Sequence, residues 1–241
     1  MLNFEFYNPT RIIFGTDTIQ RIHDFVPSDA RVLMLYGGES ARKNGTLDEV
    51  RTALGQREIQ EFGGIEPNPS YETLMKAVEL IREQKLDFLL AVGGGSVIDG
   101  TKFIAAAVNY AGDEWQILET HGAKITQALP FGSVLTLPAT GSEMNSGGVV
   151  TRKSTQTKLA FGSSHVFPQF SVLEQNKTYS LLLRQLANGV VDAFIHVMEQ
   201  YLTYSVNAQV QDRFAESLLQ TLIEIAPKVV EESADYDTRA N

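Results

Sequence analysis

The 241-residue chain contains no cysteine. Disulfide bonds and thiolate metal ligands are therefore excluded, and any metal ion must be held by histidine and carboxylate side chains. Basic residues are scarce as well, with 20 Lys and Arg against 29 Asp and Glu and a formal net charge of −9. This balance argues against a nucleic-acid partner, because binding phosphates along a nucleic acid requires an excess of cationic side chains.

Long hydrophobic runs are also missing. No apolar segment approaches the roughly 20 residues that cross a bilayer as a helix. The amino-terminal stretch MLNFEFYNPTRIIFG has Glu5 and Pro9 where a secretory signal requires a basic start and an apolar run. We therefore expect a cytoplasmic protein without a membrane partner. Its 43% hydrophobic content is enough for one large or two moderate cores.

The first two thirds of the chain alternate between strand and helix patterns. Residues 31–38 (RVLMLYGG) and 87–92 (DFLLAV) are apolar runs without polar alternation, which is typical of strands buried on both faces. Between them, Ser70 is placed to cap a helix whose apolar residues recur at helical spacing. This alternation predicts an α/β fold with a parallel sheet covered by helices.

The pattern changes in the second half. Residues 131–143 are expected to form a strand and then a loop, and residues 149–161 two short strands joined by a polar turn. After residue 178 only helical periodicity remains. We place the domain boundary there: residues 1–178 form an α/β domain and residues 179–241 begin an all-α domain. A helical domain of about 60 residues would be marginal alone, which suggests that its carboxyl-terminal part is missing.

Three glycines and a serine, Gly93, Gly94, Gly95 and Ser96, follow the apolar run that ends at Val92. A helix is expected to begin near Ser96. Its first amides and the positive end of its dipole suit a phosphate, and glycines allow that phosphate to approach the backbone. The loop matches neither the GxGxxG fingerprint nor a P-loop, so a tight turn without a ligand remains the alternative.

Asp192 and His196 lie four residues apart in a predicted helix, and therefore on one face. A carboxylate and an imidazole at this spacing can bind one divalent ion, although the same spacing is common in plain surface ion pairs. Apolar neighbours such as Val191 and Phe194 predict a largely buried helix, in which the Asp and His would need a partner such as a cation.

Five segments together resemble one enzyme family: YGGES, GGIEPNPSYETL, LLAVGGGSVIDGTKFIA, LTLPATGSEMN and ANGVVDAFIHVMEQY. They are similar to the iron-containing (group III) alcohol dehydrogenases, and within them to the NADPH-dependent butanol dehydrogenase or aldehyde reductase branch. The resemblance implies a Rossmann-like dinucleotide-binding domain followed by an all-α metal-binding domain, and a homodimer. It also implies hydride transfer between NAD(P) and a small primary alcohol or aldehyde, with bound Fe²⁺ or Zn²⁺.

The resemblance also assigns site residues. Asp192 and His196 correspond to the first two metal ligands of the family. The residues implied to bind the cofactor are Gly37, Gly38, Ser40, Asn68, Gly93, Gly94, Gly95, Ser96, Asp99, Thr136, Leu137, Thr140, Ser142 and Lys158.

Glu39 departs from the pattern of this branch. Gly37, Gly38 and Ser40 match the segment that holds the adenosine ribose, where NADP carries its 2′-phosphate. A carboxylate among them favours NAD, because it accepts a hydrogen bond from the 2′-hydroxyl and repels a phosphate. We expect NADP(H) nevertheless, with Glu39 directed outward and Ser40, Arg42 and Lys43 available to the phosphate. NAD(H) stays open as the alternative.

The end of the chain is a second departure. The family completes its metal site with two histidines well beyond His196, and the sequence ends at Asn241. We therefore expect either a fragment of a longer enzyme or an inactive product. Two further alternatives are a non-catalytic dinucleotide-binding fragment and an enzyme resembling glycerol dehydrogenase.

Overall fold

The computed structural model describes residues 3–231 and 235–241. The chain packs as two compact units. The α/β unit contains Asn8–Thr136 and Gly141–Glu174. The described residues of the helical unit are 3–7, 137–140, 175–231 and 235–241. The domain boundary that the sequence suggested after residue 178 stays a prediction.

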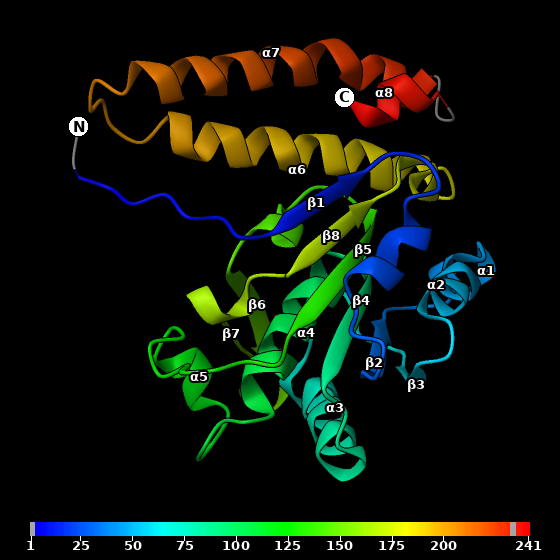
Figure 1. The fold of residues 1–241 in the computed structure, drawn as a ribbon. Coiled ribbons are helices and arrows are strands. Elements are labelled where there is room, and N and C mark those ends of the chain that lie inside the picture. The colour runs from blue at the N-terminus through cyan, green and yellow to red at the C-terminus, as the bar shows by residue number, and fades with distance from the viewer. Residues whose placement is uncertain (1–2, 232–234) are drawn as a thin grey trace. The chain divides into compact units, whose positions relative to one another are not determined.

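A six-stranded parallel sheet forms the centre of the α/β unit (Figure 1). The fold class is thus confirmed as α/β, with a Rossmann-like part and a helical region. The sequence analysis did not predict three short strands of the sheet, which are β1 (Arg11–Phe14), β3 (Glu58–Phe62) and β8 (Phe170–Leu173). The order across the sheet is β1 (Arg11–Phe14), β8 (Phe170–Leu173), β5 (Phe131–Leu137), β4 (Phe88–Gly94), β2 (Arg31–Tyr36), β3 (Glu58–Phe62).

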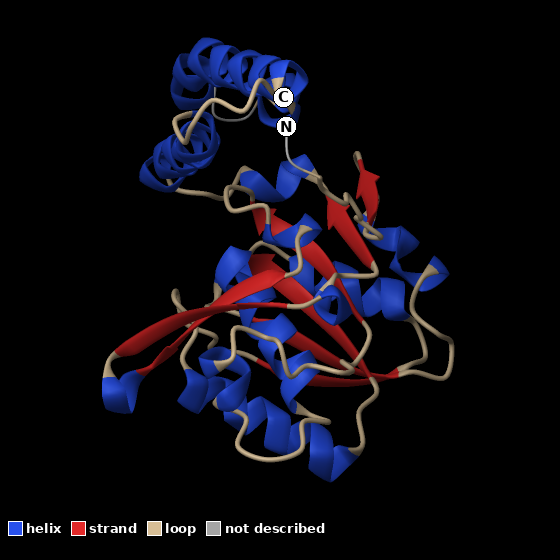
Figure 2. Ribbon diagram, turned by 90° about the vertical axis from the view of Figure 1, so that its left-hand side faces the viewer, coloured by secondary structure: helices blue, strands red, loops and turns tan. Residues whose placement is uncertain are grey.

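Helices lie on both sides of these strands (Figure 2). The α3 helix begins where the sequence predicts, because the Ser70 hydroxyl accepts a hydrogen bond from the Thr73 amide. The helical segments of this unit are η1 (Ile19–Asp24), α1 (Ser40–Lys43), α2 (Thr46–Leu54), α3 (Tyr71–Gln84), α4 (Gly95–Ala107), α5 (Gln116–Glu119), η2 (Ser142–Met144), η3 (Lys153–Thr155) and η4 (Ser164–Val166).

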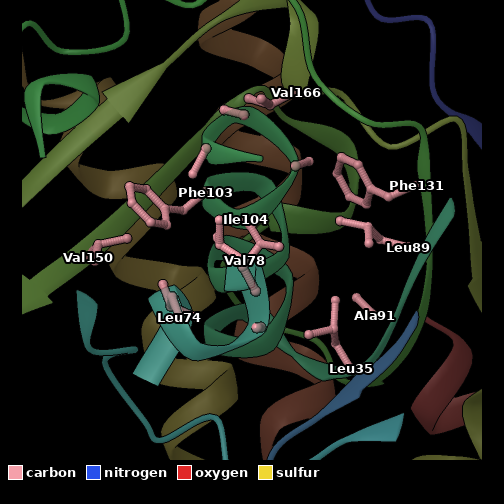
Figure 3. Packing of buried hydrophobic residues seen from close by; sticks show 14 of the residues in the cluster. Leu35, Leu74, Val78, Leu89, Ala91, Phe103, Ile104, Phe131, Val150 and Val166 are labelled. Atoms are coloured by element: carbon pink, nitrogen blue, oxygen red, sulfur yellow. The ribbon is translucent and has the colours of Figure 1, made fainter. Parts of the chain in front are cut away.

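Two cores cover the two faces of the sheet. Alternate side chains of β2 enter different cores: Leu33 and Leu35 pack with α3 and α4, whereas Val32 and Met34 pack with η1 and α2. Figure 3 shows part of the first core, including Leu35. Burial on both faces is the reason that these strands read as continuous apolar runs.

A separate antiparallel ribbon joins β6 (Gly147–Arg152) to β7 (Thr157–Gly162) through η3. This confirms the two short strands and polar turn expected over residues 149–161. Val150 and Phe161 attach the ribbon to the core that contains α3 and α4. The turn at its tip, residues 153–156, is exposed.

The helical unit contains η5 (Gln175–Thr178), α6 (Leu183–Tyr201), α7 (Gln209–Glu231) and α8 (Tyr236–Ala240). The α6 and α7 helices lie side by side (Figure 1), and the Tyr201 hydroxyl donates to the Glu216 carboxylate at 2.8 Å. Among the helices described, none has the length and hydrophobicity required to span a membrane.

Candidate functional site

Two glycine-bearing loops leave the sheet side by side at its switch point. The chain runs from β2 to the edge strand β3 and then returns to β4, on the other side of β2. Tyr36 is paired with Val92, so Gly37 and Gly93 follow neighbouring strand ends. In open α/β sheets, ligands bind outside the carboxyl ends of the strands at such a point.

Close packing against Val97 explains part of the glycine content here. A Cβ atom on Gly93 would lie 2.6 Å from Val97 Cγ2, and one on Gly37 would lie 3.2 Å from the Ile65 carbonyl oxygen. A side chain at Gly93 would therefore push the first turn of α4 away from the sheet. At Gly38, in contrast, a Cβ atom would meet open space.

The amino terminus of α4 has the features of an anion site. Its N-cap is Gly94, no side chain caps it, and its first turn holds no acidic residue. The amides of that turn lack helical acceptors and carry the positive end of the helix dipole. The residues that the sequence predicts for phosphate binding thus form the end of β4 and the start of α4.

Three predicted cofactor residues from distant parts of the chain meet beside this helix start. The Asn68 amide donates to Ser96 Oγ at 3.3 Å, and Lys158 Nζ donates to Asn68 Oδ1 at 2.7 Å. Asn68 has a φ of +56°, a conformation that asparagine tolerates better than most residues. The α4 terminus, the loop before α3 and the ribbon strand β7 therefore converge.

Asp99 and Ser142 have internal partners. Ser142 Oγ donates to Asp99 Oδ1 at 2.6 Å, and the Val149 amide donates to Asp99 Oδ2 at 3.0 Å. Ser142 is almost fully buried. These contacts give both residues a structural role, and their direct role toward a cofactor stays a prediction.

Lys102 is the buried cation of this network. It has no exposed surface, and its ammonium donates to Ser142 Oγ at 2.9 Å, to Asn145 Oδ1 at 2.7 Å and to the Gly147 carbonyl at 2.7 Å. Burial lowers the pKa of Lys102 to about 8, against the opposing charges of Asp99 and Glu143. Burial likewise raises the pKa of Asp99, although its hydrogen bonds and Lys102 oppose the change.

The sequence analysis did not identify the contacts between Lys102 and the loop of residues 141–147. The signal for burial was available, because Lys102 is followed in the helix by Phe103, Ile104 and three alanines. A lysine there needs polar partners from another segment. The same loop is held from β8, where Ser171 Oγ donates to the Glu143 carbonyl at 2.7 Å.

The remaining predicted cofactor residues of the β5 region lie in both units. Thr136 belongs to the α/β unit, whereas Leu137 and Thr140 belong to the helical unit. Within that unit, a Cβ atom on Gly189 of α6 would lie 3.3 Å from the Pro138 carbonyl oxygen. The segment Leu137–Thr140 therefore packs closely against α6.

At the end of β2, Glu39 and Ser40 are both exposed. Arg42 Nε lies 3.6 Å from Glu39 Oε2, so the carboxylate has a cationic neighbour one helical turn away. The Arg42 guanidinium also donates to the Tyr36 hydroxyl and lies 3.5 Å from Glu61 Oε2. Arg42 is thereby held near the glycines at 37 and 38.

Asp192 and His196 approach each other on α6, with His196 Nε2 at 3.7 Å from Asp192 Oδ2. Two atoms that each bind a tetrahedral ion at about 2.1 Å lie about 3.4 Å apart, so the pair fits two ligands of such a site. It equally fits a surface ion pair, and Glu199 lies 3.8 Å from the other ring nitrogen. The described residues include no group of three or more His, Asp or Glu side chains arranged to hold a metal ion.

The expectation that this helix is largely buried was wrong. The side chains of Asp192 and His196 are each 48% exposed, and Val191 and Ile195 are exposed as well. The only buried residue recorded within α6 is Leu186. Apolar residues on most sides of a helix predict burial, but in the part of the chain described here α6 packs chiefly against α7.

The parallel sheet, its two glycine loops and the helices on both faces define a Rossmann-like α/β protein with a helical extension. Two sequence families match it: "Iron-containing alcohol dehydrogenase" over residues 9–175 and "Fe-containing alcohol dehydrogenase family, C-terminal" over residues 186–241. The chain belongs to the iron-containing alcohol dehydrogenase family.

Two curated relatives match nearly the whole chain. The NADPH-dependent aldehyde reductase YqhD of Escherichia coli is 59% identical over 100% of this chain and 63% of its own length. The probable NADH-dependent butanol dehydrogenase 1 of Bacillus subtilis is 46% identical over 99% of this chain and 62% of its own. The chain therefore spans less than two thirds of either relative.

The crystal structure of E. coli YqhD superimposes with a TM-score of 0.97. It is 59% identical in sequence, and the match covers 99% of this chain and 62% of that structure.

We predict that Lys102→Met lowers the free energy of unfolding by about 3 kcal/mol, because it leaves the buried Asp99 carboxylate without its cation. Urea unfolding at pH 7 measures the change. Lys124→Met is the matched control, since Lys124 is exposed and its ammonium donates to Gln116 Oε1 at 3.2 Å. A loss for Lys102→Met no larger than that of the control would contradict the structural role of the buried ammonium.

Proposed function

We propose that the protein is a metal-dependent, NAD(P)-linked alcohol dehydrogenase or aldehyde reductase acting on a small primary alcohol or aldehyde. The observation that carries this proposal is the pair of glycine loops that end neighbouring strands at the switch point of the sheet. The reaction class is supported by the relatives, whose names describe an aldehyde reductase and a butanol dehydrogenase.

In this proposal the start of α4 binds the dinucleotide. The backbone of residues 93–96 and the uncapped amides of α4 receive the pyrophosphate. Lys158, held on Asn68, interacts with the nicotinamide ribose, and Gly37, Gly38 and Ser40 receive the adenosine ribose. Thr136, Leu137, Thr140 and Ser142 line the nucleotide between these ends, and Asp99 supports them through its hydrogen bond with Ser142.

Gly38→Val tests the dinucleotide site without disturbing the fold. A Cβ atom at position 38 would have no atom within 4 Å apart from its chain neighbours, so the thermal unfolding midpoint should stay unchanged. The valine side chain would occupy space needed by the ribose, so we expect the dissociation constant of NADPH to rise at least tenfold. Calorimetric titration measures this change, and an unaltered constant would remove Gly38 from the site.

We further propose a preference for NADP(H). The two relatives differ here, since one is named NADPH-dependent and the other NADH-dependent. In this chain Glu39 would disfavour a 2′-phosphate, but Arg42 lies beside it and offsets its charge. Arg42, Lys43 and the Ser40 hydroxyl are then the groups available to the phosphate.

The Glu39→Gly variant should bind NADPH more tightly relative to NADH than the unmodified protein does. Removing the carboxylate eliminates repulsion of the phosphate and the acceptor for the 2′-hydroxyl. The ratio of the two dissociation constants is the readout. A ratio equal to that of the parent protein would show that Glu39 does not face the ribose.

Asp192 and His196 are the proposed protein ligands for Fe²⁺ or Zn²⁺, since a carboxylate and an imidazole suit either ion. A bound divalent ion would act as a Lewis acid on the oxygen of the alcohol or aldehyde. The protein contributes by keeping both ligands on one face of α6. The segment Leu137–Thr140 packs against the same helix.

The metal assignment predicts that Asp192→Ala and His196→Ala each lower bound iron or zinc at least tenfold, while circular dichroism remains unchanged. Both side chains are half exposed, so their loss should leave folding intact. Elemental analysis measures the metal, with Asp212→Asn on the exposed surface of α7 as the control. Parental metal content in both variants would reject the site, and dinucleotide binding without any metal would favour a non-catalytic binding module.

A further inference from the structure

The ammonium of Lys158 donates to Asn68, while apolar packing holds the strand through Leu159, which packs against the core, and Phe161, which is buried in it. Lys158 is exposed on β7, and the tip of the β6–β7 ribbon is exposed as well. A two-stranded ribbon is marginally stable by itself. Toward the exposed tip, polar contacts with the loop of residues 66–70 and with α3 add to this packing.

Backbone contacts join the ribbon to the loop that carries Asn68. Thr151 of β6 is paired with Lys158 across the ribbon. The Thr151 amide donates to the Pro69 carbonyl at 2.9 Å, and Thr151 forms a parallel bridge with Ser70. The strand position opposite Lys158 is thus attached directly beside Asn68.

Glu66 provides a second attachment, nearer the tip. Its Oε1 accepts hydrogen bonds from Lys153 Nζ at 2.6 Å, from Thr73 Oγ1 at 2.8 Å and from Ser70 Oγ at 3.1 Å. Burial alone would raise the pKa of Glu66, but these hydrogen bonds outweigh it and lower the pKa to about 2. The carboxylate is therefore ionised at neutral pH and pairs with Lys153.

Glu72 holds the same turn through its backbone. Its two carboxylate oxygens accept from the amides of Lys153, at 3.2 Å, and Ser154, at 3.1 Å. Two acidic residues on the loop and the first turn of α3 thus bind the turn between β6 and β7. The sequence analysis did not single out Glu66, Glu72, Lys153 or Ser154.

We propose that Glu66 and Lys153 are positioning residues, whose ion pair holds the β6–β7 ribbon on the loop of residues 66–70 and so places Lys158 at the dinucleotide site. The inference rests on the proposed function only in assigning that site. An ion pair with one partner 60% exposed adds little to global stability. Its effect is therefore local, and it reaches the cofactor through Lys158.

Hydrogen exchange in the dinucleotide-free protein tests the placement of the ribbon. Glu66→Gln and Lys153→Met should speed exchange at the amides of Thr151, Lys153 and Ser154 at least fivefold, with an unchanged thermal midpoint. The controls are Glu79→Gln and Lys76→Met, both exposed on α3. Because Lys153 is largely exposed, Lys153→Met decides the question even if Glu66→Gln does not fold.

A double-mutant cycle tests the route through Lys158. We expect Glu66→Gln, Lys153→Met and Lys158→Met each to raise the dissociation constant of NADPH several-fold. Adding Glu66→Gln or Lys153→Met to Lys158→Met should change the constant no further. A merely structural role would instead weaken binding equally in both backgrounds.

The outcomes separate this inference from the proposed function. The positioning role would be overturned if Glu66→Gln and Lys153→Met both kept the hydrogen-exchange rates of the parent protein. It would also be overturned if their effects on the NADPH dissociation constant added to that of Lys158→Met. Neither result would affect the proposal that the protein binds a dinucleotide. If the two variants exchanged faster but the parent protein bound no dinucleotide at all, the ion pair between Glu66 and Lys153 would be supported as a positioning contact. The proposed function would then be rejected.

Discussion

The candidate dinucleotide site depends on how closely the first turn of α4 approaches the sheet. Val97 fills the space that a side chain at Gly93 would need, and it also lies near Gly37. A side chain at position 93 would displace the first turn of α4, and one at position 37 would crowd the Ile65 carbonyl oxygen at 3.2 Å. Close packing at both positions thus leaves bare backbone at the switch point, where the uncapped amides of the 13-residue α4 helix begin.

Polar groups then hold three separate segments around that helix start. Lys102 and Asp99 bind the loop after β5, Asn68 bonds to Ser96, and Glu66 holds the turn of the ribbon. Lys102 and Asp99 are buried ionisable groups, and burial favours the neutral form of such groups unless polar partners stabilise the charged form. Hydrogen bonds therefore join the segments around the α4 terminus, in addition to the apolar packing of the ribbon.

Family membership and local geometry support the metal assignment to different degrees. The family match covers both the α/β part and residues 186–241, so α6 belongs to a segment that the family shares. The geometry contributes a carboxylate and an imidazole 3.7 Å apart on an exposed face. Asp192 and His196 would supply only two of the four ligands of a tetrahedral ion. The metal content of the protein is therefore the informative measurement for this helix.

The sequence by itself determined the α/β class, the β2 and β4 strands, the Ser70 cap and the glycine loop, because periodicity, capping and glycine content are local properties. It also indicated Asp192 and His196, since a spacing of four residues defines one helix face. Only the tertiary structure decided that Gly37 lies beside Gly93 and that Lys102 holds a distant loop. It also showed that α6 is largely exposed within the described chain, and that Glu66 binds a ribbon 87 residues further on. These relations join segments far apart in the chain, and no local pattern encodes which of them become neighbours.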